Sequence, residues 1–185
     1  VIIAGNRILF SEDGSVWKQA DVQTGVSRLE LIAYGNGRFV AIDGEGRVAI
    51  STRGDIWTEG GNTGTARFLY RLRFENGLFV AVGDKGSIFT SRDGGDWKDR
   101  SVVSPSFSNV FFQDAIYYKG RWLVTDINEV WASSDGDTWG QLISRHSNKF
   151  VKLAIARGVL VGFGNPLLLS DAGLRASKLQ TAEDL

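Results

Sequence analysis

Charged residues recur at one position of a repeated unit in this sequence. When the first strand-like run of each unit is aligned on the turn that follows it, Arg71, Asp114 and Lys152 share a column with Leu31. Opposite charges that converge on one position could form a polar binding site. The alternative is that these side chains pair with one another and with water, which would make them structural.

Other residues could support catalysis. His146, the only histidine, could serve as a general base or a metal ligand, although a histidine in a loop between units is more often simply exposed. Asp114 and Glu30 could act as the carboxylate pair of a glycosidase if their side chains meet. No Ser/His/Asp set can be assembled around His146, so we assign no catalytic residue and expect no cofactor and no metal.

Charged residues also gather in the turns between the second and third strands of the units. We interpret them as solvated turn residues, with a binding surface as the alternative. They are Asp43, Glu45, Asp84, Lys85, Asp126, Asn128 and Glu129.

The elements that must position these residues are marked by a recurring turn. The segments 11–17, 91–97 and 133–139 share the pattern Ser-x-Asp-Gly-x-x-Trp, and the segment 51–57 has Arg53 in place of the aspartate. Their tryptophans are 40, 40 and 42 residues apart, and a fixed period of this size predicts a repeat architecture. A fifth copy at 170–173 has Ala172 after its aspartate and Ala176 where the tryptophan is expected.

Each residue type in the turn has a physical role. The aspartate accepts backbone N–H bonds, the glycine allows a positive φ, and the tryptophan fills a seam between units. Calcium binding is the alternative, but the turns are too short and too poor in carboxylates for an EF-hand loop. The residues expected to build the turns are Ser11, Asp13, Gly14, Trp17, Ser51, Gly54, Trp57, Ser91, Asp93, Gly94, Trp97, Ser133, Asp135, Gly136 and Trp139.

The segments between the turns have the pattern of short strands. In the clearest unit, strand-like runs at 29–34, 38–42 and 47–52 precede a fourth that begins at Trp57, and Asn36-Gly37 is a hairpin signal. No segment has a sustained helical period. Four antiparallel strands in about 40 residues are typical of a propeller blade.

We therefore predict an all-β chain, a β-propeller of about five four-stranded antiparallel blades. The blades span roughly 1–25, 26–65, 66–108, 109–147 and 148–185 of a single domain, and the first lacks its first strand. We expect a closed ring, because closure leaves no open strand edge. The alternative is an open arc completed by another chain or by missing sequence.

The turns resemble the Asp-box (BNR) repeat, Ser/Thr-x-Asp-x-Gly-x-Thr-Trp, although they are one residue shorter. The run 34–41 also resembles one common in bacterial proteins of this repeat class. The resemblance implies turns on the outer rim of a propeller and favours a secreted, periplasmic or cell-surface location. Proteins with such repeats include sialidases, other glycoside hydrolases, sortilin-like receptors, photosystem assembly factors and lectins. The sialidase motif Arg-Ile/Leu-Pro is missing, since Arg7-Ile8-Leu9 lacks the proline.

Composition limits the possible partners. The 21 basic and 21 acidic residues give no net charge, which argues against a nucleic-acid surface. No apolar run is long enough to span a bilayer, and without cysteine there is no disulfide or thiolate site. We predict a non-catalytic binding or scaffold module for a protein or carbohydrate partner. The alternative is a glycoside hydrolase of the sialidase kind, or a remnant or fragment of one.

Overall fold

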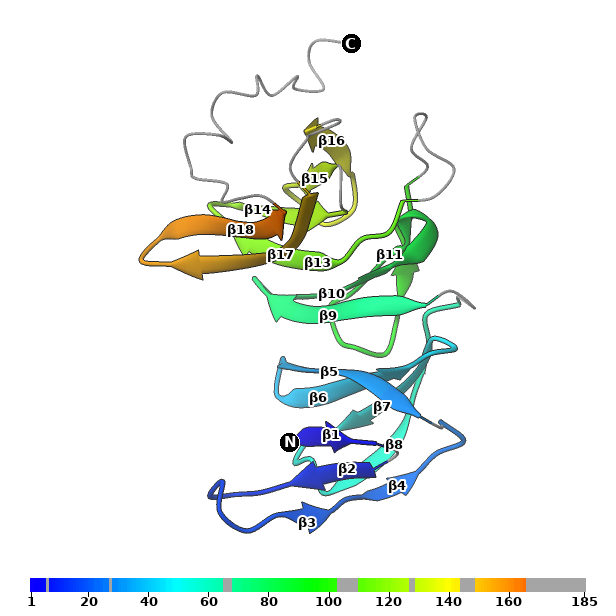
Figure 1. The fold of residues 1–185 in the computed structure, drawn as a ribbon. Helices are drawn as coiled ribbons and strands as arrows, with labels where there is room; N and C mark the ends of the chain where they lie inside the picture. Colours follow the sequence, from blue (N-terminus) through cyan, green and yellow to red (C-terminus); the bar gives the residue numbers. More distant parts are fainter. Residues whose placement is uncertain are drawn as a thin grey trace.

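The chain forms a series of antiparallel sheets stacked along one direction (Figure 1). The computed structural model describes residues 1–5, 7–26, 28–64, 68–102, 110–126, 129–143 and 149–165. Within these ranges the regular elements are β-strands and one 3-10 turn, η1 (Asp84–Gly86). We call each sequence repeat with its sheet a blade.

Strands that follow one another within a blade pair antiparallel. Blade one contains β1 (Ile2–Ala4), β2 (Arg7–Phe10) and β3 (Lys18–Gln19). Blade two contains β5 (Leu29–Gly35), β6 (Arg38–Asp43), β7 (Arg47–Ser51) and β8 (Ile56–Asn62). Blade three contains β9 (Leu69–Glu75), β10 (Leu78–Gly83), β11 (Ile88–Ser91) and β12 (Lys98–Asp99). Blade four contains β13 (Asp114–Tyr118), β14 (Arg121–Thr125), β15 (Val130–Ser133) and β16 (Gly140–Ile143). The predicted four-stranded blades are confirmed in blades three and four, as is the missing first strand of blade one.

Blade five is described in part. Its first two strands are β17 (Lys149–Ala156) and β18 (Val159–Asn165). The degenerate turn at 170–173 and Ala176 lie outside the described residues.

Blade two differs from the prediction by one additional strand. After β3 the chain forms β4 (Asp21–Gln23), which pairs parallel to β8 at the outer edge of blade two. The backbone N–H of Asp21 also donates to the carbonyl oxygen of Asp55 at 2.8 Å. The predicted four-stranded sheet is therefore a five-stranded sheet here, because the linker between blades one and two covers an otherwise open strand edge.

The first hairpin of each complete blade closes with two residues at positive φ, as in a type I′ turn. The Asn-Gly hairpin predicted at 36–37 is confirmed, and the same turn recurs in blades three to five. The pairs are Asn36-Gly37, Asn76-Gly77, Lys119-Gly120 and, in blade five, Arg157-Gly158.

The apolar core lies in the seams between blades. Alternate side chains of a strand point to opposite faces, so Ala41 of β6 packs toward blade one while Val40 packs toward blade three. The next two seams follow the same rule, with Trp122 buried between blades three and four and Leu160 between blades four and five. Each central blade is thus buried on both faces.

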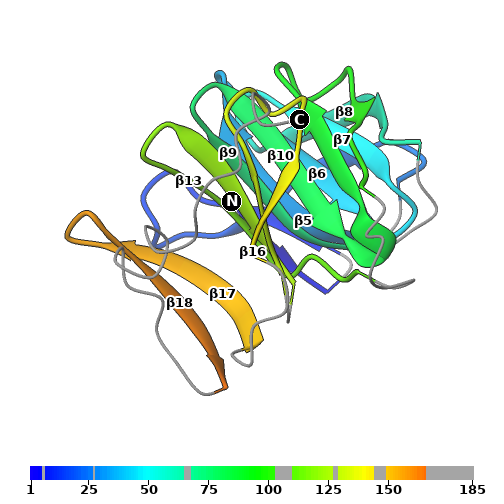
Figure 2. The same cartoon turned by 90° about the horizontal axis from the view of Figure 1, so that it is seen from above.

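The described blades do not close into the expected ring. The innermost strands contact in sequence order, β1 with β5, β5 with β9, β9 with β13, and β13 with β17. Figure 1 places blades one and five at opposite ends of the stack, and Figure 2 shows β17 and β18 to one side of the other blades. Within the described residues, each blade therefore packs only on its neighbours in the sequence.

The recurring turns share one hydrogen-bonding pattern. The indole N–H of each tryptophan donates to the carbonyl oxygen of the turn glycine, at 3.0 to 3.3 Å. Trp17, Trp57, Trp97 and Trp139 therefore make the same hydrogen bond within their turns. Their surroundings differ, because Trp57 is fully buried against blade one whereas Trp17, on the outer face of blade one, is 42% exposed.

The turn glycines contact the blade that precedes them. A Cβ on Gly94, at φ +78°, would lie 2.4 Å from Cγ2 of Val40 in blade two. The seam therefore requires glycine for space as well as for its left-handed backbone. Gly14 has the same backbone conformation, but a Cβ added there would have no other atom within 4 Å, because no described blade precedes blade one.

The turn aspartates should make stability depend on pH. Backbone N–H groups, that of Thr138 above all, lower the pKa of Asp135 from 3.8 to about 2. The pKa values of Asp13 and Asp93 are lowered for the same reason, chiefly by the N–H groups of Val16 and Asp96. Because the pKa falls on folding, the stabilisation is complete above the unfolded pKa and is lost as the pH falls through the folded value.

We therefore expect the urea midpoint to decline as the pH is lowered from about 4 to about 2. Asp135→Asn should flatten this part of the curve, whereas Glu59→Gln, on an exposed side chain of β8, should leave its slope unchanged. Parallel curves for the wild type and Asp135→Asn would contradict a stabilising role of this carboxylate.

Candidate functional site

The structure brings together two of the three charged residues of the inner column. Nε of Arg71 lies 2.7 Å from Oδ1 of Asp114, so that an ion pair links β9 of blade three to β13 of blade four. Lys152 on β17 is exposed. Of these three charged residues, Arg71 and Asp114 therefore form a structural ion pair, and Lys152 faces solvent.

Asp114 is fully buried, accepts three hydrogen bonds and has a second arginine as an ion-pair partner. Besides Arg71, the guanidinium of Arg73 lies 3.5 Å away, and the backbone N–H groups of Ala115 and Leu153 donate to the carboxylate at 3.0 and 2.9 Å. Leu153 belongs to blade five, so one carboxylate joins three blades. These donors hold Asp114 in a structural position.

The proposed glycosidase pair is not assembled in the structure. Glu30 lies on β5 of blade two and is exposed, whereas Asp114 lies on β13 of blade four, with β9 of blade three between them. His146 lies outside the described residues.

Three of the turn residues interpreted as solvated are instead buried, and the prediction is wrong for Asp43, Asp126 and Glu129. Asp43 accepts hydrogen bonds from the backbone N–H and Nε of Arg47, and Glu129 accepts one from the indole N–H of Trp131 at 2.9 Å. The carboxylates close their own turns, which offsets the cost of burial.

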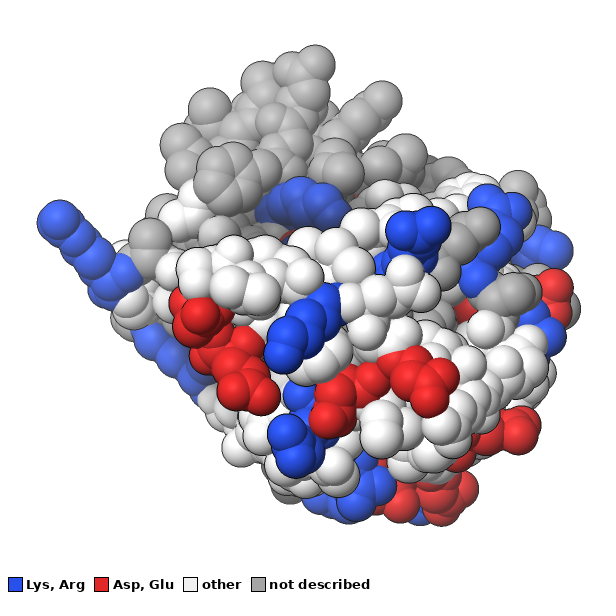
Figure 3. All heavy atoms as spheres, turned by 90° about the horizontal axis from the view of Figure 1, so that it is seen from below, with Lys and Arg blue, Asp and Glu red and all other residues white. Residues whose placement is uncertain are grey.

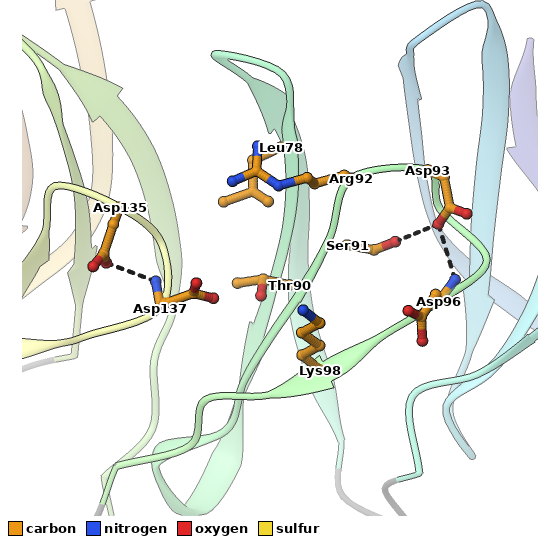
Figure 4. Close-up of a pocket in the computed structure, with 9 residues that line it drawn as sticks. All are labelled: Leu78, Thr90, Ser91, Arg92, Asp93, Asp96, Lys98, Asp135 and Asp137. Atoms are coloured by element: carbon orange, nitrogen blue, oxygen red, sulfur yellow. Dashed lines mark hydrogen bonds between the residues drawn. The ribbon is translucent and has the colours of Figure 1, made fainter.

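A pocket of about 240 Å³ opens on the rim between the turns of blades three and four (Figure 4). Blade three supplies most of its lining and the turn of blade four faces it across the gap. The lining residues are Leu78, Thr90, Ser91, Arg92, Asp93, Asp96, Lys98, Asp135 and Asp137.

This pocket exists because the outer strand of blade three is short. In the seam between blades two and three, the seven-residue strand β8 approaches the next turn closely, and a Cβ on Gly61 would lie 2.6 Å from the carbonyl oxygen of Gly95. Strand β12 has two residues. The corresponding contact is made by long side chains instead, with Nη2 of Arg100 2.7 Å from Oδ1 of Asp137.

The pocket presents both signs of charge. The carboxylates of Asp93 and Asp135 are bonded within their own turns. Arg92, Lys98 and Asp96 are exposed at the pocket, and Figure 4 shows Arg92 and Lys98 on the blade-three side, opposite the Asp135–Asp137 turn. The pocket can therefore contact acidic and basic groups of a ligand at once.

Sequence reasoning missed Arg92 and Lys98 as site residues. A signal was present in the alignment of the turns. Blade three has cations at positions 92 and 98, where blade two has the uncharged Thr52 and Thr58. Only the seam geometry shows that these two cations face a cavity.

Other kinds of site are not evident in the described part of the chain. Its Asp and Glu side chains form no group of three that could hold a metal ion. None of its helices has the length and apolar character needed to cross a membrane. Seen from the blade-one end, acidic and basic side chains are interspersed with uncharged surface (Figure 3), so that the described part of this face has no extended patch of one sign.

Stacked antiparallel meanders whose innermost strands pack side by side define the chain as a β-propeller. Solved structures support this class. YCF48 bound to a D1 peptide has a TM-score of 0.60 and 21% identity, over 85% of this chain and 54% of that one. YCF48 from Cyanidioschyzon merolae has a TM-score of 0.62 and 16% identity, over 89% and 62%. A catalytically inactive virginiamycin B lyase from Staphylococcus aureus, with quinupristin, has a TM-score of 0.67 and 12% identity, over 86% and 56%.

At these identities the similarity concerns the fold. The chain spans between about half and two thirds of the length of these three proteins. No protein-family model matches the sequence, and no curated protein matches it.

Proposed function

We propose that this protein is a non-catalytic binding or scaffold propeller whose partner is a segment of another protein. The observation on which the proposal rests is the rim pocket between blades three and four, with free charges of both signs beside Leu78. The peptide-bound state of YCF48, a similar fold, supports a polypeptide as the kind of ligand. We also assign the recurring turns to the Asp-box repeat, on the sequence resemblance.

The chemistry of the pocket favours a peptide over a carbohydrate. Arg92 and Lys98 would pair with acidic side chains of the partner, and Asp96 with a basic one. None of the lining residues is aromatic, so the pocket lacks the flat apolar faces on which sugar rings stack. A partner segment that carries both signs of charge fits best.

The inner column is a second contact in this proposal. Lys152 is exposed and Arg71 is partly exposed, so both can meet acidic groups of the partner. Asp114 would contribute by fixing the guanidinium of Arg71.

A peptide selection tests the pocket. Peptides selected from a random phage-displayed library on the wild-type protein would be measured by fluorescence anisotropy. We expect the double variant Arg92→Glu/Lys98→Glu to weaken binding about tenfold or more, because it reverses two charges at the contact. The matched control is Lys18→Glu, since Lys18 follows its tryptophan in blade one as Lys98 does in blade three.

Selected peptides that bind equally well to both variants would place the site elsewhere. A panel of fluorogenic glycosides tests the hydrolase alternative, and turnover that Asp114→Asn abolishes would overturn the non-catalytic proposal.

A further inference from the structure

The seam between blades three and four differs from the seam before it at two positions that face each other across the rim. Between blades two and three these positions are Gly60 and Gly95, and a Cβ on Gly95 would lie 3.3 Å from the carbonyl oxygen of Gly60. Counted from the turn tryptophan of each blade, the equivalent positions of the next seam hold Arg100 and Asp137. One seam therefore closes by backbone contact where the next is spanned by two side chains.

Arg100 and Asp137 form an ion pair between the two blades. Nε and Nη2 of Arg100 lie 2.9 and 2.7 Å from Oδ1 of Asp137. The backbone N–H of Arg100 donates to the carbonyl oxygen of Ile88, which fixes the chain at one end of the pair. The N–H of Asp137 donates to the carboxylate of Asp135, which fixes the other end. The pair is therefore a spacer of defined length beside the rim pocket, and its guanidinium cancels the charge of Asp137.

The blade-three wall of the pocket carries cations. Thr90 of β11 lies opposite both Lys98 and Val80, and Val80 packs toward blade four. Because residues directly opposite in a sheet share a face, Lys98 also faces blade four. Figure 4 shows Arg92 pointing to the same side. Within the part of the chain that the structure describes, neither Arg92 nor Lys98 has an ion-pair partner.

These cations dominate the gap between the two walls. On the blade-four side, Asp137 is paired and the carboxylate of Asp135 is bonded within its own turn. The other carboxylates of the lining are those of Asp93 and Asp96, and Figure 4 shows both on the far side of Lys98 from Asp137. An acidic group in the gap would therefore meet two cations without a partner of their own.

We propose that the Arg100–Asp137 pair holds the rim pocket open and, by cancelling the charge of Asp137, makes the pocket select an acidic side chain of the partner. Arg92 and Lys98 would bind the carboxylate of that side chain, and Leu78 would contact its methylene groups. Arg100 is a positioning residue, since it acts through Asp137. This selectivity rests on the proposed function, because the ligand is taken to be a protein segment.

The absence of cysteine from the sequence allows a chemical probe of the pocket that needs no partner. A single cysteine introduced by Thr90→Cys would be alkylated with iodoacetate, which is an anion, and with iodoacetamide, which is neutral. Nearby cations raise the thiolate fraction equally for both reagents, so the ratio of the two rates isolates the attraction of the anion. We expect this ratio to be about fivefold higher than for Thr58→Cys, on an exposed side chain of β8, and to fall with added salt.

Variants of the ion pair in the Thr90→Cys protein separate its two effects. Arg100→Gln leaves the charge of Asp137 uncancelled, so the preference for iodoacetate should fall about threefold while the iodoacetamide rate is unchanged. Arg100→Gly/Asp137→Gly gives this seam the residues of the seam before it, and should slow both reagents because the walls approach each other. The charge-swapped variant Arg100→Asp/Asp137→Arg keeps the spacer and should restore the iodoacetamide rate. Arg53→Gln, which removes an exposed ion pair of blade two, should change neither rate.

The peptides selected on the wild-type protein provide the binding test. Each aspartate or glutamate of a peptide would be replaced in turn by its amide, and we expect one such change to weaken binding about tenfold or more. The same change should have little effect on binding to Arg92→Glu/Lys98→Glu, because the cations that recognise the carboxylate are gone.

The outcomes distinguish this selectivity from the proposed function itself. Peptides that depend on Arg92 and Lys98 but tolerate every amide would overturn the selectivity and leave the rim pocket as the binding site. Equal rate ratios for Thr90→Cys and Thr58→Cys, or a ratio unchanged by Arg100→Gln, would overturn the role of the ion pair. Failure of the proposed function would appear instead as peptides that bind the wild type and Arg92→Glu/Lys98→Glu equally well.

Discussion

Replacing Trp57 by alanine is expected to lower the free energy of unfolding by about 3–5 kcal/mol. Trp57 is fully buried between blades one and two, where its ring centroid lies 6.2 Å from that of Phe39. Alanine would leave a cavity that the neighbouring sheets cannot close, because their strands are fixed by hydrogen bonds on both sides. The change would be measured as a shift of the urea midpoint.

Trp17 provides the matched control. It has the same place in its turn and the same hydrogen bond to the turn glycine, but nearly half of it is exposed. We expect Trp17→Ala to cost under about 1 kcal/mol, and Trp97→Ala, on a half-buried side chain, to lie between the two. Equal midpoints for Trp17→Ala and Trp57→Ala would contradict the seam as the source of this stability.

Asp114→Asn is expected to cost about 3 kcal/mol, because it removes one partner of a buried ion pair. Asparagine keeps the shape but loses the charge that faces Arg71 and Arg73, and its amide nitrogen cannot accept the backbone N–H groups that now point at the carboxylate. Both arginines are partly exposed, so water can replace some of the lost contacts. The loss in free energy of unfolding should therefore be smaller than for a fully buried ion pair.

Hydrogen exchange would separate local from global effects of Asp114→Asn. The amide of Leu153 donates directly to Asp114, so its protection should fall most. Lys152 holds the same position in its repeat as Asp114 but is exposed. Lys152→Gln should therefore change the free energy of unfolding by no more than about 0.5 kcal/mol. An unchanged Leu153 amide would mean that Asp114 does not hold blade five to blade four.

Much of this fold is encoded locally and could therefore be predicted. The hairpin at Asn36-Gly37, the period of the tryptophans and the alternation within each strand depend on residues close together in the sequence. The three-stranded sheet of blade one was also predicted, because the strand-like runs of this unit match the second, third and fourth strands of the other units.

The remaining features depend on contacts between blades. Strand β4 has three residues and is stabilised by β8, more than thirty positions away, so its own sequence gives little signal. The burial of Asp43 and Glu129 depends on hydrogen bonds that composition cannot reveal. The rim pocket depends on the difference in length between β8 and β12, which only the assembled seam makes visible.

The stacking of each blade on its sequence neighbours alone has a thermodynamic consequence. Such a chain resembles a one-dimensional array, whose stability is approximately the sum of blade terms and nearest-neighbour seam terms. Within the described residues, blades one and five have one seam each, so opening should begin there and advance inward one seam at a time. Strand β4 changes this at one end, because it lies between blade one and blade two in the sequence and pairs with the outer strand of blade two. Blades one and two should consequently open as a single cooperative unit, leaving the opposite end as the one from which single blades detach.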